Sequence, residues 1–190
     1  KMPGLTLDST LNNKVAFSTS HNVAAVKVGY KKPDEYILMM AHWDHLGIKE
    51  DQPGDNIYNG AVDNASGTAG LLELANYFSS IDTERSLLFL AVTAEESGLL
   101  GSQYFAEYPP IDLSNIVAGY NFDGVLPIGK TRDMIVVGYG ASELEDILKD
   151  ELDKVDKYIY ESYNDKCFKS FILYGWIFKK PSKIFFISSL

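Results

Sequence analysis

The chain has 190 residues, 46% of them hydrophobic, which is enough to bury the core of one ordinary globular domain. Its formal net charge of -9 argues against nucleic acids and anionic membrane surfaces as partners. The single cysteine, Cys167, excludes an intrachain disulfide and a zinc site built on cysteines. No apolar run reaches the roughly 20 residues that a membrane-spanning helix needs, so we expect no membrane span.

The first half of the chain predicts two strands and a helix, joined by polar connections. Residues 22–30 alternate small and β-branched side chains, and residues 35–41 form a continuous apolar run, which is typical of a strand buried on both faces. Residues 42–64 are polar, rich in aspartate and without periodicity, and predict a long loop. Residues 65–80 predict an amphipathic helix with Asn64 as its N-cap.

The second half continues the alternation of strands and helices. Residues 86–94 predict a second buried strand, and a short helix is expected from about residue 98 to the residue before Pro109. Two further strands, at 115–122 and 133–139, precede a helix at about 143–156. This order favours an α/β fold with a mostly parallel, buried sheet, and we interpret residues 1–190 as one domain.

Polar side chains follow three of these predicted strands at the point where each strand ends. His42 and Asp44 come after the second strand, Glu95 and Glu96 after the third, and Asp123 after the fourth. Ligands bind beyond the carboxyl ends of parallel strands, so we expect these side chains to share one edge of the sheet. Carboxylates gathered in this way repel one another unless cations compensate, and two divalent metals would do so.

The remaining candidates are in the loop ahead of the predicted helix. Asp63 is placed to bridge two metal ions about 3.5–4 Å apart, although alone it would be a helix-capping residue. Neighbouring side chains of an extended segment point in opposite directions, so one of Glu95 and Glu96 can bind a metal while the other acts as a general base. His45 is close to His42 and is an alternative ligand, but we interpret it as a hydrogen-bonding residue of the loop.

Four segments in this order resemble metallopeptidase family twenty-eight, whose members include bacterial leucyl aminopeptidases. The segments are AHWDHLG at 41–47, NGAVDNASGTAGLLELA at 59–75, TAEESGLLGSQYF at 93–105 and NFDG at 121–124. The resemblance implies a three-layer α/β/α zinc-exopeptidase domain that holds two Zn²⁺ ions and removes N-terminal residues from peptide substrates. It also implies a cis peptide bond between Asp63 and Asn64, and a secreted or periplasmic location.

The resemblance implies a role for each matching residue. The expected zinc ligands are His42, Asp63 (the bridge), Glu96 and Asp123. Glu95 matches the general base, and Asp44 matches the carboxylate that orients His42.

Two features depart from the family pattern. The family has a fifth ligand, a histidine far downstream, but the only histidines here are His21, His42 and His45. Residues 166–190 contain no Asp or Glu and are rich in Phe, Ile, Lys and Ser, so we interpret them as an atypical tail. Two alternatives therefore stay open: an inactive receptor-type or truncated homologue, and a single-zinc transferase of the glutaminyl-cyclase type.

Overall fold

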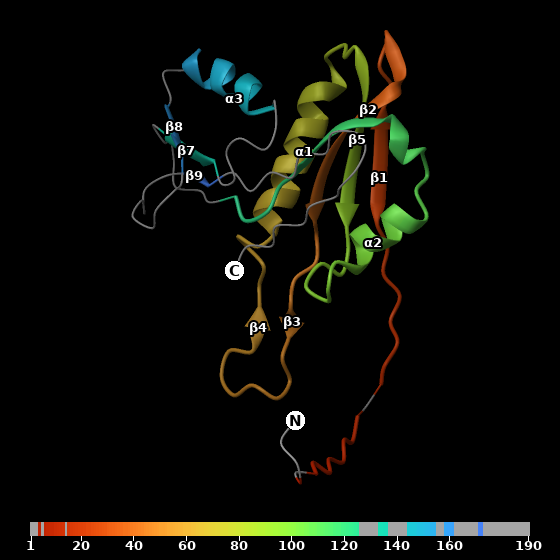
Figure 1. The fold of residues 1–190 in the computed structure, drawn as a ribbon, viewed down its shortest axis with the longest axis vertical. Helices are drawn as coiled ribbons and strands as arrows, with labels where there is room; N and C mark the ends of the chain where they lie inside the picture. Colours follow the sequence, from red (N-terminus) through yellow and green to blue (C-terminus); the bar gives the residue numbers. More distant parts are fainter. Residues whose placement is uncertain are drawn as a thin grey trace.

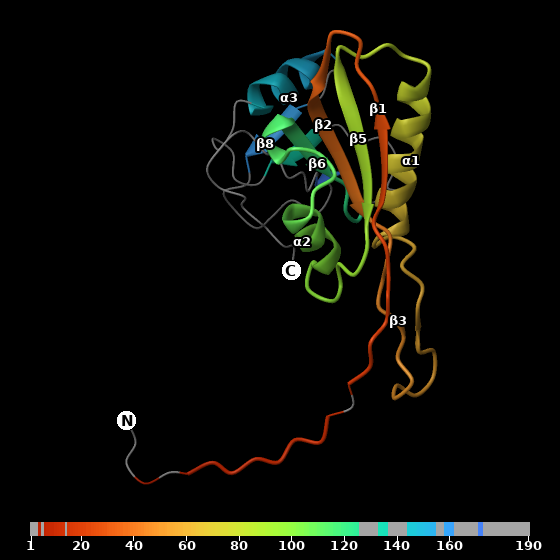
Figure 2. The ribbon, with the colours of Figure 1, turned by 90° about the vertical axis from the view of Figure 1, so that its right-hand side faces the viewer.

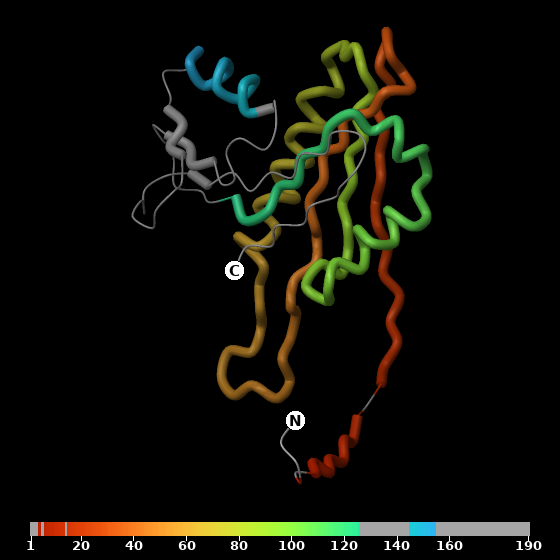
Figure 3. Tube along the Cα trace, viewed as in Figure 1, coloured from red at the N-terminus to blue at the C-terminus, as the bar shows by residue number. Residues whose placement is uncertain are grey.

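The computed structural model describes residues 4, 6–13, 15–125, 133–136, 144–154, 158–161 and 171–172. Figure 1 shows the order of the elements along the chain, and Figure 3 shows that the segment before the first strand runs away from the sheet. In chain order the elements are β1 (Val23–Lys27), β2 (Lys32–His42), β3 (Gly47–Ile48), β4 (Ile57–Tyr58), α1 (Ala65–Ser79), β5 (Arg85–Val92), α2 (Leu100–Glu107), the 3₁₀ helix η1 (Leu113–Asn115), β6 (Ile116–Asn121), β7 (Asp133–Val136), α3 (Leu144–Asp153), β8 (Tyr158–Glu161) and β9 (Phe171–Ile172).

The main sheet has four strands in the order β1-β5-β2-β6. The central strand β2 pairs in parallel with both β5 and β6, whereas β1 pairs antiparallel with β5 at the edge. His42, the last residue of β2, pairs with Val92, the last residue of β5. The predicted α/β class and mostly parallel sheet are therefore confirmed, and the carboxyl ends of β2, β5 and β6 meet at one edge.

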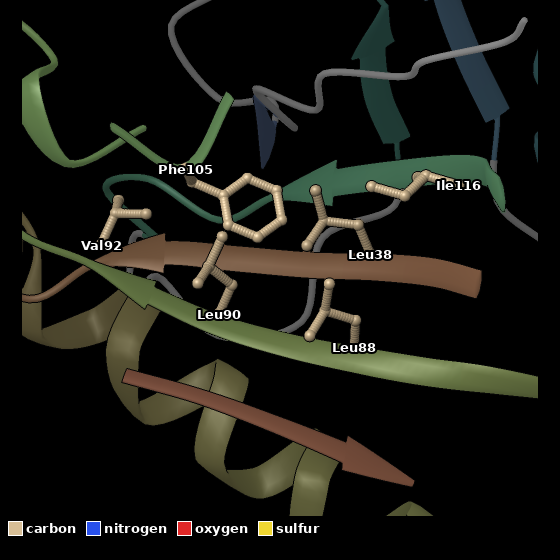
Figure 4. Close-up of a cluster of buried hydrophobic side chains, with 6 residues drawn as sticks. All are labelled: Leu38, Leu88, Leu90, Val92, Phe105 and Ile116. Atoms are coloured by element: carbon tan, nitrogen blue, oxygen red, sulfur yellow. The ribbon is translucent and has the colours of Figure 1, made fainter. Parts of the chain in front are cut away.

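The two faces of this sheet carry separate hydrophobic clusters because side chains alternate along each strand. One cluster lies between the sheet and α2 (Figure 4) and contains Leu38, Leu88, Leu90, Val92, Phe105 and Ile116. The other lies between the sheet and α1 and contains Met39, Ala41, Leu71, Leu87 and Phe89. Figure 2 shows α1 and α2 on opposite faces of the sheet, which gives the three layers that the family resemblance implied.

The predicted loop at 42–64 contains two short strands that the sequence pattern does not predict. Strands β3 and β4 form a small antiparallel hairpin in which Gly47 pairs with Tyr58 and Ile48 with Ile57. Each strand has two residues, too few to show the alternation by which a strand is recognised in a sequence. Figure 1 shows the hairpin extending beyond the edge of the sheet toward which β5 points.

Part of the C-terminal region is also described. The predicted strand at 133–139 and helix at 143–156 correspond to β7 and α3, with shorter bounds. Strands β8 and β9, which were not predicted separately, pair in parallel with either side of β7. Strand β9 is within the predicted tail at 166–190, and the rest of that tail is outside the described residues. Among the residues that the structure describes, no helix is long and apolar enough to cross a membrane.

Replacing either of two glycines in α1 by alanine should change the free energy of unfolding, with opposite signs at the two positions. A Cβ at Gly67 would overlap the Asn64 side chain and the Phe122 carbonyl, whereas a Cβ at Gly70 meets nothing within 4 Å. We expect Gly67→Ala to lower the free energy of unfolding by roughly 1–3 kcal/mol through overpacking. Gly70→Ala should raise it by roughly 0.5–1 kcal/mol, because alanine favours the helix. Urea unfolding of both variants measures these changes in the free energy of unfolding. An equal change in both variants would contradict the close approach of α1 to residue 122.

Candidate metal centre and catalytic site

The imidazole of His42 is at the centre of the site. It is 2% exposed, and its Nε2 atom is 3.0 Å from Asp63 Oδ1 and 3.5 Å from Asp123 Oδ1. On the other side of the ring, Nδ1 is 3.1 Å from the Asp44 carbonyl oxygen, to which it can donate a hydrogen bond. A neutral imidazole that donates from Nδ1 has a bare lone pair at Nε2. Facing two carboxylates, that nitrogen needs either a second proton or a metal ion.

The electrostatics of His42 follow from this geometry. Burial alone would lower the pKa of His42, but the hydrogen bond to Asp123 and the negative charges of Asp123, Glu95 and Asp63 outweigh it. Together they raise the pKa of His42 to about 9. In the metal-free protein, therefore, a proton at neutral pH occupies the position between the imidazole and the carboxylates. A divalent cation at that position would bind the same imidazole and carboxylates, and it would bring two positive charges in place of the single charge of the proton.

Asn64 holds the two strand ends against the start of α1. Its side chain is 1% exposed and forms four hydrogen bonds. The amide nitrogen donates to the carbonyls of His42 and Phe122, and the amide oxygen accepts from the backbone N–H groups of Gly67 and Gly124. The predicted N-cap is confirmed, since the bond from Gly67 caps α1. The link to β2 and β6 was not predicted, because a capping pattern carries no information on distant partners.

Asp63 and Asp123 are carried by the two segments that Asn64 connects. The peptide bond between Asp63 and Asn64 is cis, as the family resemblance implied. The side chain of Asp63 is 53% exposed and that of Asp123 is 29% exposed, so both carboxylates face the open side of His42. Asp123 is two residues after the end of β6, and the intervening Phe122 N–H continues the pairing with β2 by donating to the Met40 carbonyl.

Glu95 and Asp44 are joined through the backbone. The Glu95 N–H donates to Asp44 Oδ1 at 3.1 Å, which links the segments that follow β5 and β2. The Asp44 carboxylate is 3.6 Å from His42 Nδ1, so the closer contact of that nitrogen is with the Asp44 backbone carbonyl. In this structure, residue 44 therefore contacts His42 through its backbone and supports Glu95 through its side chain. Its predicted role in orienting His42 stays a prediction.

The Glu95 carboxylate is half-buried and close to other negative charges. Burial is the largest influence and raises its pKa above the ordinary value; the charge of His42 opposes this, and the charges of Asp123, Glu96 and Asp63 add to the increase. A carboxylate with a raised pKa is a better proton acceptor near neutral pH than an ordinary surface glutamate. The environment of Glu95 is therefore suited to the predicted general base.

A second group of possible ligands is built around Glu96. His45 Nδ1 is 2.6 Å from Glu96 Oε1, and Asp63 completes a group whose ligand atoms lie within 4.8 Å of one another. Within the described residues, the other such group is that of His42, Asp63 and Asp123, so Asp63 belongs to both. The hydrogen-bonding role that we expected for His45 stays a prediction; in the described structure its Nδ1 atom faces Glu96 Oε1 at a distance that allows an ion pair.

The predicted site residues thus gather at the carboxyl edge of the sheet. Their nitrogen and carboxylate donors are those that zinc prefers, and a shared carboxylate is typical of two-metal sites. The model of peptidase family M28 matches residues 22–171 of this chain. The chain belongs to peptidase family M28. The resemblance first seen in four short segments extends over most of the chain.

Curated proteins that are similar in sequence point in the same direction. The chain is 29% identical over 147 residues to aminopeptidase YwaD of Bacillus subtilis, covering 76% of this chain and 28% of that protein. It is 36% identical over 116 residues to a probable zinc metalloprotease of Pyrenophora teres, covering 60% of this chain and 24% of that protein. The chain therefore spans about a quarter of the length of these curated relatives.

A solved structure supports the fold of this M28 chain. The leucine aminopeptidase precursor of Bacteroides thetaiotaomicron superposes with a TM-score of 0.58 at 21% identity, covering 81% of this chain and 64% of that one. At this level of identity the likeness concerns the fold alone. The structure is similar to a zinc-aminopeptidase fold.

Proposed function

We propose that this chain forms the catalytic core of a zinc-dependent aminopeptidase that cleaves the first peptide bond of its substrates. The observation that carries the proposal is the buried imidazole of His42, which faces Asp63 and Asp123 at 3.0 and 3.5 Å with Glu95 beside them. Family membership and the relatives named as aminopeptidases support it.

We assign one zinc ion to His42, Asp63 and Asp123, and a second to the group that contains Asp63 and Glu96. Asp63 is then the shared ligand of both ions. When bound, zinc supplies a Lewis acid that polarises the scissile carbonyl and makes a nearby water more acidic. The donor sets fit this role, because each leaves exposed carboxylate oxygens on the solvent side of the site.

Glu95 supplies the proton transfers in this proposal. Its carboxylate takes a proton from the attacking water while the water oxygen bonds to the scissile carbonyl carbon. When the carbon–nitrogen bond breaks, Glu95 returns that proton to the leaving amine. The hydrogen bond from the Glu95 N–H to Asp44 fixes the backbone from which the carboxylate extends. The negative charges around the site favour a substrate with a protonated amino terminus.

Activity on leucine p-nitroanilide tests the proposal. We expect turnover that is lost on dialysis against a chelator and restored by added zinc, with no cleavage of a substrate whose amino group is acetylated. Zinc binding without turnover would instead support an inactive, receptor-type homologue. Formation of pyroglutamate from a peptide with an N-terminal glutamine would support the glutaminyl-cyclase alternative.

We also propose a secreted or periplasmic location on the family resemblance, which fractionation of the source cells would test.

Zinc binding should release a proton from His42. The raised pKa, about 9, keeps the imidazole protonated at pH 7, but a metal ligand must be neutral. We therefore expect about one proton to be released from His42 per zinc ion bound at this site near pH 7. Affinity should rise with pH until about 9 and level off above it. Calorimetric titration in buffers of different ionisation enthalpy measures the protons released, and a value independent of pH between 6 and 10 would contradict the assignment.

A further inference from the structure

We propose that Asn22 is a positioning residue for Glu95, which it holds in place through the turn that connects β5 to α2. This β5–α2 turn comprises residues 93–101, and Glu95 lies within it. The inference rests on the proposed function, because Glu95 is the general base of the proposed reaction. It brings into the site a residue from the segment before β1, to which the sequence pattern assigned no chemistry.

The side chain of Asn22 bonds to both ends of the β5–α2 turn. Its Oδ1 atom accepts a hydrogen bond from the Thr93 N–H at 3.1 Å, and its Nδ2 atom donates to the Gly101 carbonyl at 2.7 Å. The next residue, Val23, pairs with Ala91 of β5, so the amide of Asn22 continues the link between the two strands where their backbone pairing ends. One amide group therefore fixes the first and the last residue of the turn.

The two ends of the turn lie against each other at Thr93 and Gly101, which are both buried. The Gly101 N–H donates to the Thr93 carbonyl at 2.9 Å, and a Cβ at Gly101 would overlap that carbonyl and lie 2.6 Å from Asn22 Oδ1. The Ser20 hydroxyl is 2.6 Å from the Thr93 hydroxyl. Buried N–H groups are nearly always satisfied, so removal of the Asn22 amide would force the Thr93 N–H to find another partner.

The backbone next to Glu95 has a conformation that depends on its surroundings. Ala94 has a φ of +54° and Leu99 a φ of +63°, which is the left-handed region that is costly for residues other than glycine. Such residues keep this conformation when the surrounding structure fixes it. Ala94 stands between Thr93 and Glu95. Release of the Thr93 N–H would therefore let Ala94 relax and would turn the Glu95 side chain away from its place.

The backbone of Glu95 has two other anchors. Its N–H donates to Asp44 Oδ1 at 3.1 Å, and its carbonyl accepts from the N–H groups of Gly98 and Leu99 at 2.9 and 2.8 Å. These bonds tie Glu95 to the segment after β2 and to the inside of the turn, whereas Asn22 ties the turn to the start of β1. A displacement of about 1 Å at a reacting group can cost about 100-fold in rate. Loss of the Asn22 amide should therefore be seen in kcat.

Asn22→Ala in the 190-residue chain tests the inference, with leucine p-nitroanilide as the substrate and zinc at saturation. We expect kcat to fall by about 10–100-fold and KM to stay within about twofold of the wild-type value, because a general base acts in the transition state. In the Glu95→Gln background, Asn22→Ala should change kcat by less than about twofold, since no base is left to position. Without zinc or substrate, the backbone amides of Glu95 and Leu99 should exchange hydrogen faster in Asn22→Ala than in the wild type.

Ser86→Ala is a matched control for the loss of stability. Ser86 is fully buried at the other end of β5, and its hydroxyl also joins two backbone segments. It accepts from the Gly29 N–H at 3.0 Å and donates to the Pro33 carbonyl at 2.7 Å. We expect both alanine variants to unfold at lower urea concentrations than the wild type. Ser86→Ala should nevertheless keep wild-type kcat and wild-type exchange at the Glu95 amide.

The outcomes separate the inference from the proposed function. No turnover by the zinc-loaded wild-type chain would overturn the proposed function and the inference with it. Wild-type turnover with an unchanged kcat in Asn22→Ala, or losses that multiply in the double variant with Glu95→Gln, would overturn the inference alone.

Asn22→Asp is a milder variant, which keeps the acceptor for the Thr93 N–H but loses the donor to the Gly101 carbonyl. Its kcat should lie between those of Asn22→Ala and the wild type, and a wild-type kcat would count against the inference even if Asn22→Ala did not fold.

Discussion

Glu95→Gln is expected to lower kcat by about 10²–10⁴-fold while both zinc ions stay bound. The amide has nearly the shape of the carboxylate but cannot accept a proton from water. The backbone N–H of residue 95 still donates to Asp44, so the substitution should leave the backbone of the site in place. The raised pKa of Glu95 depends on its half-buried, negatively charged surroundings, which a neutral side chain tolerates well.

The measurement combines kcat for a leucine anilide with the zinc content of the same preparation. Glu107→Gln is a matched control, because Glu107 is an exposed glutamate at the end of α2, away from the strand ends. We expect the control to keep wild-type turnover and zinc content. Turnover of Glu95→Gln at the wild-type rate would show that Glu95 is not the general base. Loss of zinc together with activity would instead assign it to metal binding.

Asp63→Asn should weaken zinc binding at both sites. Each loss should exceed the about 100-fold that removal of a residue hydrogen-bonded to a metal ligand can cost. Asp63 is the one residue common to both ligand groups of the described structure, and its Oδ1 atom is 3.0 Å from His42 Nε2. Asparagine keeps an oxygen donor but loses the negative charge that holds two cations close together. The expected result is therefore loss of two ions from a single substitution.

Neighbouring ligands provide the contrast for Asp63. Asp123→Asn should weaken zinc binding at His42 alone, and Glu96→Gln zinc binding at Glu96 alone, because each of these residues belongs to one ligand group. Asp82→Asn, in the exposed segment after α1, controls for the loss of one negative charge and should change neither site. Calorimetric zinc titrations of the four variants measure these effects. An Asp63→Asn variant that loses only one ion would contradict the bridging role.

Much of the fold could be predicted because its strongest signals are local. The apolar runs at 35–41 and 86–94 correspond to β2 and β5, which carry most of both hydrophobic clusters. The antiparallel edge position of β1 could not be predicted, since pairing direction depends on contacts far apart in the sequence. The β3–β4 hairpin was missed because its paired segments are too short to show a period.

The site could be predicted where it depends on the order of the strands, but not where it depends on the shape of the loops. Polar residues that end parallel strands must lie at one edge, and the structure brings His42, Glu95, Glu96 and Asp123 together there with Asp63. The position of His45 depends instead on the hairpin and on the left-handed backbone at Gly60, neither of which the sequence pattern reveals. The contact of the Asp44 side chain with the Glu95 backbone is equally a product of loop geometry.

The most direct test of zinc binding at the sheet edge is a crystal structure of this chain grown with zinc, with anomalous diffraction measured at the zinc absorption edge. We expect one zinc ion bonded to His42, Asp63 and Asp123, and a second bonded to Asp63 and Glu96. A folded chain with no anomalous density beside His42 Nε2 would contradict it.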